Sequence, residues 1–161
     1  MGKSGKPLGV AVFRGVTNVT LDAKGRLAVP TRYRERLLER GGNNLVVTVD
    51  SGHILLLYPL PEWEQVEAKL NSLPTTNARA RQLQRLLVGH ATEVELDGAG
   101  RVLLPLPLRE FAALDKRVVL IGQGNKFELW DEARWLQQRE QWLKPDGDGT
   151  PLIAELESLN Y

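Results

Sequence analysis

The sequence contains no cysteine, and this absence excludes disulfide bonds, thiol nucleophiles and cysteine-ligated metal sites. It has only two histidines, His53 and His90, and neither has carboxylates at the spacing of a zinc site, so both are expected to be structural. No apolar run approaches the roughly 20 residues that a membrane-spanning helix needs. An excess of one charge is also lacking, since 21 Lys and Arg balance 20 Asp and Glu.

Sequence signatures of catalysis are lacking as well. The chain has no serine nucleophile elbow, kinase signature or dinucleotide-binding loop. Asp22 and Asp97 resemble an acid and base pair only superficially, because an Asp that opens a turn usually spends its oxygens on backbone hydrogen bonds. Lys3 and Lys6 are not followed by the apolar core of a secretory signal. We therefore expect a cytoplasmic protein that is not an enzyme and that uses no cofactor, metal, membrane or small-molecule substrate.

What the sequence does contain is an internal repeat. Residues 17–30 align with residues 92–105, and seven of these fourteen positions are identical. The identical residues are Thr, Val, Leu, Asp, Gly, Arg and Pro, so each copy holds Asp-x-x-Gly-Arg followed by a proline. Four residues after the prolines, Arg34 aligns with Arg109. A repeat of this kind predicts two copies of one structural unit.

Each copy is predicted to form a strand, a tight turn, a second strand and a short helix. Apolar residues alternate before the Asp, which is typical of a half-buried strand. Asp-x-x-Gly fits a type I turn that is followed by a left-handed glycine. Pro30 and Pro105 then preorganise helices that we expect over residues 31–39 and 106–114.

The segments after the repeated turn predict a hairpin and a closing helix in each half. Glycine turns between β-branched and aromatic residues indicate hairpins over residues 45–58 and 118–130. Apolar residues at near-helical spacing from Trp63 and from Trp135 indicate the closing helices. A further helix is expected over residues 78–88, between the two halves.

These elements predict an α+β protein in which two tandem modules pack as a pseudo-twofold, β-barrel-like core with flanking helices. The modules are expected to pack on each other because two such small halves cannot each bury a large core alone. The expected parts are a flexible N-terminal extension at 1–12, a first repeat at 13–73, a connecting helix at 74–90, a second repeat at 91–144, and a flexible acidic linker and tail at 145–161.

Charge distinguishes the two copies. Residues 14–40 contain seven basic and three acidic side chains, a net charge of +4, whereas residues 89–116 contain three basic and five acidic ones, a net charge of −2. Only the first copy is therefore suited to a polyanion. Arg26 and Arg101 follow the turn glycines, and each could instead form a local ion pair that only pins the turn. A repeated sequence is compatible with either role.

The helix expected over residues 78–88 is basic and contains no acidic residue. Its arginines are Arg79, Arg81 and Arg85. A solvated face, or pairing with the glutamates of the preceding helix, is favoured over contact with DNA. Those glutamates are Glu62, Glu64 and Glu67.

Five segments of the chain carry a family resemblance. They are Phe13-Arg14-Gly15, the two Asp-x-x-Gly-Arg turns with their prolines, Arg85-Leu-Leu-Val-Gly-His90, and Asn125-Lys-Phe-Glu-Leu-Trp130. Over about residues 13–143 the chain resembles the MraZ family, the duplicated branch of the AbrB-like swapped-hairpin transcription factors. The resemblance implies a bacterial regulator that binds double-stranded DNA at the division and cell-wall gene cluster, often at its own promoter. It also implies a ring of several subunits.

The same resemblance assigns roles to residues of the repeat. Arg26 is the leading candidate for contact with DNA bases, with Lys24 beside it, Arg14 on the approaching strand and Arg32 as a further phosphate contact. Arginine can bond guanine through two hydrogen bonds, whereas lysine meets phosphate as a point charge. The residues expected to orient the turns are Asp22, Gly25, Asp97, Gly100 and Arg101. Arg101 matches the motif too, but its acidic surroundings make it a weaker DNA candidate that could serve a subunit contact.

One departure from the family concerns the start of the chain. MraZ-like chains usually begin at Met-Phe-Arg-Gly, and Val12 stands here in the place of that methionine. We expect either translation from a non-ATG codon at Val12 or an additional N-terminal arm.

Two other functions stay open at the level of the sequence. The balanced net charge and the acidic second copy are compatible with a ring-forming scaffold that binds DNA without sequence preference. Kinship of fold alone suggests an antitoxin-like partner of a toxin.

Overall fold

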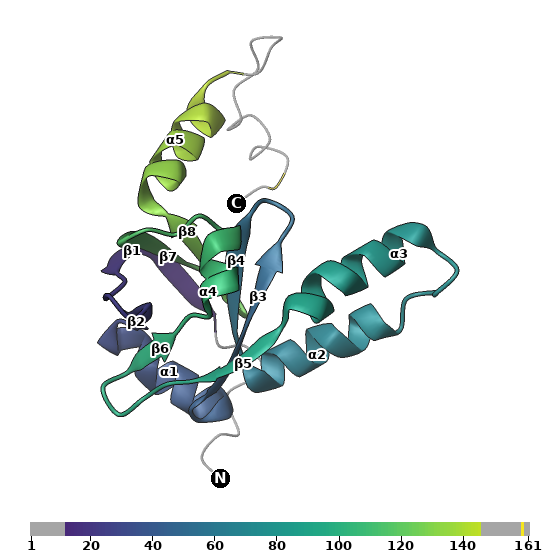
Figure 1. Ribbon diagram of the computed structural model, residues 1–161, viewed down its shortest axis with the longest axis horizontal. Helices are drawn as coiled ribbons and strands as arrows, with labels where there is room; N and C mark the ends of the chain where they lie inside the picture. Colours follow the sequence, from purple (N-terminus) through teal and green to yellow (C-terminus); the bar gives the residue numbers. More distant parts are fainter. Residues whose placement is uncertain (1–11, 146–158, 160–161) are drawn as a thin grey trace. The chain divides into compact units, whose positions relative to one another are not determined.

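The computed structural model describes residues 12–145 and residue 159, so most of the expected N-terminal extension and of the acidic tail lies outside the described residues. The chain divides into two compact units, Met1–Asp131 and Glu132–Tyr161. The second unit contains α5 (Glu132–Leu143). The elements of the first unit are, in chain order, β1 (Phe13–Thr20), β2 (Arg26–Ala28), α1 (Thr31–Gly41), β3 (Asn44–Asp50), β4 (Ile54–Pro59), α2 (Leu60–Asn71), α3 (Ala78–Leu83), the π-helical turn η1 (Gln84–Val88), β5 (Thr92–Glu95), β6 (Arg101–Leu103), α4 (Leu106–Phe111), β7 (Arg117–Gly124) and β8 (Phe127–Asp131) (Figure 1).

The described strands form one six-stranded antiparallel sheet and one two-stranded ribbon. The order in the sheet is β1-β7-β8-β4-β3-β5, and the ribbon pairs β2 with β6. β1 of the first repeat therefore pairs with the hairpin of the second repeat, and β5 of the second repeat pairs with the hairpin of the first. The counterparts in the two repeats are β1 and β5, β3 and β7, and β4 and β8. When each strand is replaced by its counterpart, the same order results, read from the opposite edge of the sheet.

The expected strand-turn-strand unit is thus divided between two sheets. The residues just after β1 meet β2 at an isolated bridge between Leu21 and Leu27, while β1 and β2 each pair along a strand of the other repeat. The hairpins β3–β4 and β7–β8 form as the sequence predicts. The mixed α+β class is confirmed with an open six-stranded sheet, while closure into a barrel-like core stays a prediction.

The two repeated helices differ in length. The prediction of a helix from Thr31 is confirmed, and α1 continues to Gly41 before Gly42 takes a φ of 67°. The predicted end of the second helix at residue 114 is wrong, because α4 ends at Phe111. There Ala113 adopts a φ of 51°, and the backbone N–H of Leu114 donates to the Arg109 carbonyl at 2.9 Å. This left-handed residue closes the helix, and β7 begins a few residues later at Arg117.

The helix expected over residues 78–88 has two parts. Asn77 caps α3 by accepting hydrogen bonds from the backbone N–H groups of Arg79 (2.9 Å) and Ala80 (3.2 Å). The regular helix then ends at Leu83 and continues as the π-helical turn η1. No helix within residues 12–145 is long and apolar enough to cross a membrane.

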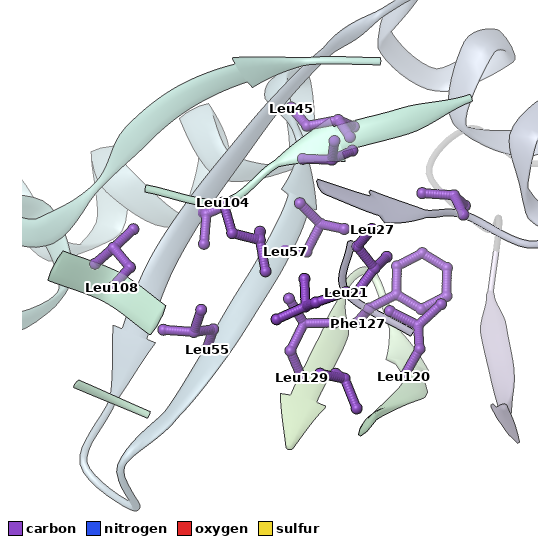
Figure 2. Close-up of a cluster of buried hydrophobic side chains, with 14 of the residues drawn as sticks. Leu21, Leu27, Leu45, Leu55, Leu57, Leu104, Leu108, Leu120, Phe127 and Leu129 are labelled. Atoms are coloured by element: carbon purple, nitrogen blue, oxygen red, sulfur yellow. The ribbon is translucent and has the colours of Figure 1, made fainter. Parts of the chain in front are cut away.

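One hydrophobic core is shared by both repeats (Figure 2). Leu27 of β2 and Val102 of β6 are both completely buried. Phe13 of the first repeat packs on Phe127 of the second, with ring centroids 4.4 Å apart, and Tyr33 meets the same ring at 4.9 Å. Each repeat therefore buries its apolar side chains against the other repeat rather than in a core of its own. In the second unit, the rings of Trp135 and Trp142 on α5 meet at 5.9 Å.

Candidate nucleic-acid interface

The first Asp-x-x-Gly-Arg segment forms the tight turn that its sequence predicts. The backbone N–H of Gly25 donates to the Asp22 carbonyl at 3.0 Å, and Gly25 adopts a φ of 84°. One carboxylate oxygen of Asp22, Oδ1, accepts the backbone N–H groups of Lys24 and Arg26, each at 2.9 Å. The carboxylate thereby organises the backbone of the whole turn.

The other oxygen of Asp22 holds the side chain of Arg26. Nε of Arg26 donates to Oδ2 of Asp22 at 2.7 Å, in a pair whose side chains are 29% and 36% exposed. The local ion pair considered in the sequence analysis is therefore present. Within the described residues, the terminal guanidinium nitrogens of Arg26 have no protein partner, so they are available to a ligand. Hydrogen bonds from the Arg26 backbone and side chain and from the Lys24 backbone lower the pKa of the Asp22 carboxyl to about 2.

The second turn reproduces this arrangement. Oδ1 of Asp97 accepts the backbone N–H groups of Ala99 (2.9 Å) and Arg101 (2.8 Å), while Nε of Arg101 donates to Oδ2 at 2.9 Å. The backbone N–H of Arg101 is the main cause that lowers the pKa of the Asp97 carboxyl. Each turn therefore presents one arginine whose orientation is fixed by an aspartate.

The ribbon brings the two arginines onto one face. β2 and β6 pair Arg26 with Leu103 and Ala28 with Arg101, so these four side chains share the outer face. The pair between them, Leu27 and Val102, points into the core. Arg26 and Arg101 consequently lie diagonally across the two-stranded ribbon. Figure 1 shows the ribbon strands β2 and β6 near α1.

The other predicted contact residues lie on the turn, on β1 and on α1. Lys24 is exposed in the first turn, and Arg14 is exposed on β1, where its carbonyl accepts the Tyr33 hydroxyl at 2.5 Å. Arg32 donates to the Thr17 hydroxyl and, at 3.1 Å, to the Tyr33 hydroxyl, and its guanidinium lies 4.7 Å from the centre of the Tyr33 ring. The structure thus brings Arg14 and Arg32 together around Tyr33. Lys24 and Arg26 share the turn.

Two further arginines contact the turns. The sequence indicated their recurrence, and it offered Arg34 either as a phosphate contact or as a structural residue. Arg109 of α4 donates through Nε to the Leu104 carbonyl at 2.9 Å, and Arg34 of α1 donates to the Val29 carbonyl at 2.7 Å. Arg109 packs against Gly25 of the first turn, and Arg34 packs against Gly100 of the second. For Arg109, the position four residues after Pro105 is the only sequence signal.

The remaining basic and histidine residues make local contacts. In the described part of the chain, none of the arginines of α3 and η1 forms an ion pair with a glutamate of α2, and Glu62 instead pairs with Arg40 at 3.8 Å. Of the two alternatives favoured for this helix, the pairing is therefore not formed among the described side chains, and Arg79 and Arg85 are exposed as on a solvated face. His53 and His90 both pack against Phe111, with ring centroids 4.8 and 5.8 Å from its centre. Among the described residues, no group of three or more His, Asp or Glu could hold a metal ion.

Comparison with known proteins identifies the family to which the chain belongs. The family described as "MraZ protein, putative antitoxin-like" matches residues 12–86 and again residues 87–146, so each match contains one of the two turns. The chain belongs to the MraZ family. The resemblance carried by Phe13-Arg14-Gly15 and by the paired turns is thereby confirmed.

Relatives in the MraZ family match almost the whole chain. A protein named "Transcriptional regulator MraZ" from Thioalkalivibrio sulfidiphilus is 58% identical over 92% of this chain and 99% of its own length. Proteins of the same name from Methylococcus capsulatus and Escherichia coli O127:H6 are 60% and 59% identical. These matches cover 83% and 89% of this chain, and 88% and 92% of the relatives.

Proposed function

We propose that this protein is a transcriptional regulator that binds double-stranded DNA with sequence preference through the outer face of the β2–β6 ribbon. The observation that carries the proposal is the pair of arginines on that face, each oriented by a turn aspartate. The major groove admits a two-stranded ribbon, and arginine can bond the edge of guanine through two hydrogen bonds. The names of the MraZ relatives support regulation of transcription.

The contact residues then divide by chemistry. Arg26 contacts a base edge through its terminal nitrogens while its Nε stays on Asp22, and Arg101 is the corresponding group of the second repeat. Lys24 meets a phosphate beside the groove, and Arg14 and Arg32 add phosphate contacts from β1 and α1. Leu103 offers an apolar group next to Arg26, of the kind that contacts a thymine methyl.

The assembly is part of the same proposal. One ribbon offers only a small basic surface, so a single subunit binds weakly. A ring of subunits that meets direct repeats on DNA gains affinity because each bound module raises the effective concentration of the next. The promoter of the division and cell-wall gene cluster, including the protein's own gene, is the expected target, in the cytoplasm at the nucleoid. The symmetric strand order supports a pseudo-twofold relation between the repeats, and closure of the core into a barrel-like form is part of the proposal.

A competition titration tests the function. The full chain is titrated against DNA from upstream of its own gene in the presence of excess unrelated duplex, at two salt concentrations. We expect shifted species containing several subunits that survive the competitor, with affinity that falls steeply as salt rises. Equal competition by the unrelated duplex would contradict the proposal.

That contradictory result would favour the ring-forming scaffold. The balanced charge of the chain and the acidic second repeat are the observations that support this alternative. An antitoxin role would instead require a small protein that purifies with the chain.

A further inference from the structure

We propose that each repeat positions the Asp-x-x-Gly-Arg turn of the other repeat, an arrangement that we call crosswise. Arg109 of the second repeat positions the turn that carries Arg26, and Arg34 of the first repeat positions the turn that carries Arg101. The inference deepens the proposed function and rests on it for its consequence in DNA binding. The crosswise contacts themselves involve no DNA, so they can be tested alone.

Gly25 is the point of contact in the first turn. Its φ of 84° disfavours any residue with a side chain. A Cβ added there would lie 2.5 Å from Cζ and 2.7 Å from Nε of Arg109, so the guanidinium lies directly against the glycine backbone. A glycine is therefore required both by the turn and by the arginine that covers it.

The Arg109 guanidinium is held in this place by the backbone of Leu104. Nε of Arg109 donates to the Leu104 carbonyl at 2.9 Å, and the backbone N–H of Leu104 donates to the Gly25 carbonyl at 3.0 Å. A single residue of the second repeat thus contacts both the turn and the arginine. Arg26 directly follows Gly25, so the conformation fixed here sets the direction of the Arg26 side chain.

The other turn has the same closed arrangement. Nε of Arg34 donates to the Val29 carbonyl at 2.7 Å, and the backbone N–H of Val29 donates to the Gly100 carbonyl at 2.9 Å. Gly100, with a φ of 75°, lies against the Arg34 guanidinium. In the crosswise arrangement, Arg109 on the helix of the acidic second repeat has its partner in the turn of the basic first repeat.

The planar guanidinium is the chemical requirement. It can lie flat against a glycine backbone while its Nε–H remains directed at a carbonyl. A lysine ammonium can reach the carbonyl, but it has no flat surface to cover the glycine. Arg109→Lys is therefore expected to retain most of the thermal stability and still to loosen the first turn.

The decisive experiment follows the Nε–H groups of Arg26 and Arg101 by nitrogen-15 NMR in the full chain without DNA. The variants are Arg109→Gln and its matched control Arg34→Gln, with Arg109→Lys as the conservative change. In Arg109→Gln we expect solvent exchange at Arg26 Nε–H to rise about tenfold, the effect of losing one charge-assisted hydrogen bond. Arg101 Nε–H should be unchanged in that variant, and Arg34→Gln should give the reverse pattern.

Equal loosening of both turns in each variant would overturn the inference, because it would show general destabilisation. No change at either Nε–H would overturn it too. A crosswise NMR pattern without loss of specific DNA affinity in Arg109→Gln would support the positioning and contradict the proposed function of the turn. Failure of the positioning and failure of the function therefore give different results.

Discussion

At the residue scale, Asp22 uses its two carboxylate oxygens for two different purposes. Oδ1 organises the backbone of the turn, and Oδ2 fixes the Arg26 guanidinium. Asp97 repeats both contacts in a repeat of opposite charge. Formation of the turn is therefore a property of the motif, whereas the proposed contact with DNA depends on where the ribbon places the arginines.

The lowered pKa of Asp22 predicts a specific dependence on pH. Its carboxyl has a pKa of about 2 in the folded protein and an ordinary value of 3.8, so the unfolded chain takes up this proton first as pH falls. The stabilisation from the carboxylate is complete above pH 3.8 and is lost as pH falls towards about 2. Denaturant unfolding measures the free energy of unfolding across this pH range. As pH falls, this free energy should decrease less steeply for Asp22→Asn than for the native chain. Asp115→Asn, which removes the same charge from an exposed position outside the turns, is the control.

A single methyl group added at Gly25 is expected to have a large effect on stability. Gly25→Ala combines a φ of 84° with a collision against Arg109, so we expect it to destabilise the fold by about 1–3 kcal/mol. Gly98→Ala is the matched control, because a Cβ at Gly98 meets nothing within 4 Å and the first repeat already has Ala23 at this position. Thermal unfolding of both variants checks the prediction. Equal midpoints for the two would contradict it.

At the scale of elements, the ribbon has a buried face and an exposed face, and the exposed face is the one proposed to contact DNA. Leu27 is completely buried, so Leu27→Ala should lower the free energy of unfolding by about 2–5 kcal/mol. Leu103 is 54% exposed on the other face, and Leu103→Ala should stay within about 0.5 kcal/mol of the native chain. Denaturant unfolding measures both changes. A large loss for Leu103→Ala would show that its face is covered within the folded chain.

The elements were largely predictable from the sequence, and their pairing was not. Alternation, turn chemistry and helix-starting prolines located the hairpins, α1 and the start of α4, because these signals act over a few residues. The end of α4 was missed because a left-handed Ala113 stops it, and no glycine or proline marks that position. The pairing of β2 with β6 joins segments about 75 residues apart, so local patterns could not show that Arg26 and Arg101 share a face.

At the scale of the whole molecule, the first repeat depends on the second. β1 pairs along its length with β7, and Phe13 packs on Phe127. A fragment of residues 12–73 would lose these partners, so we expect it not to form a folded monomer. Sedimentation and amide NMR of the fragment check this expectation. A monomer with dispersed amide signals would contradict the mutual core.

The measurement that tests the central claim most directly compares DNA binding by Arg26→Ala, Arg101→Ala and the control Arg139→Ala. Each variant loses one positive charge, and only the first two lose it on the ribbon. Fluorescence anisotropy with promoter DNA and with unrelated duplex separates specific from non-specific affinity. Arg26→Ala should lose about 1–3 kcal/mol of discrimination, Arg101→Ala should also lose discrimination, and Arg139→Ala should retain it. Native discrimination in Arg26→Ala would contradict the account.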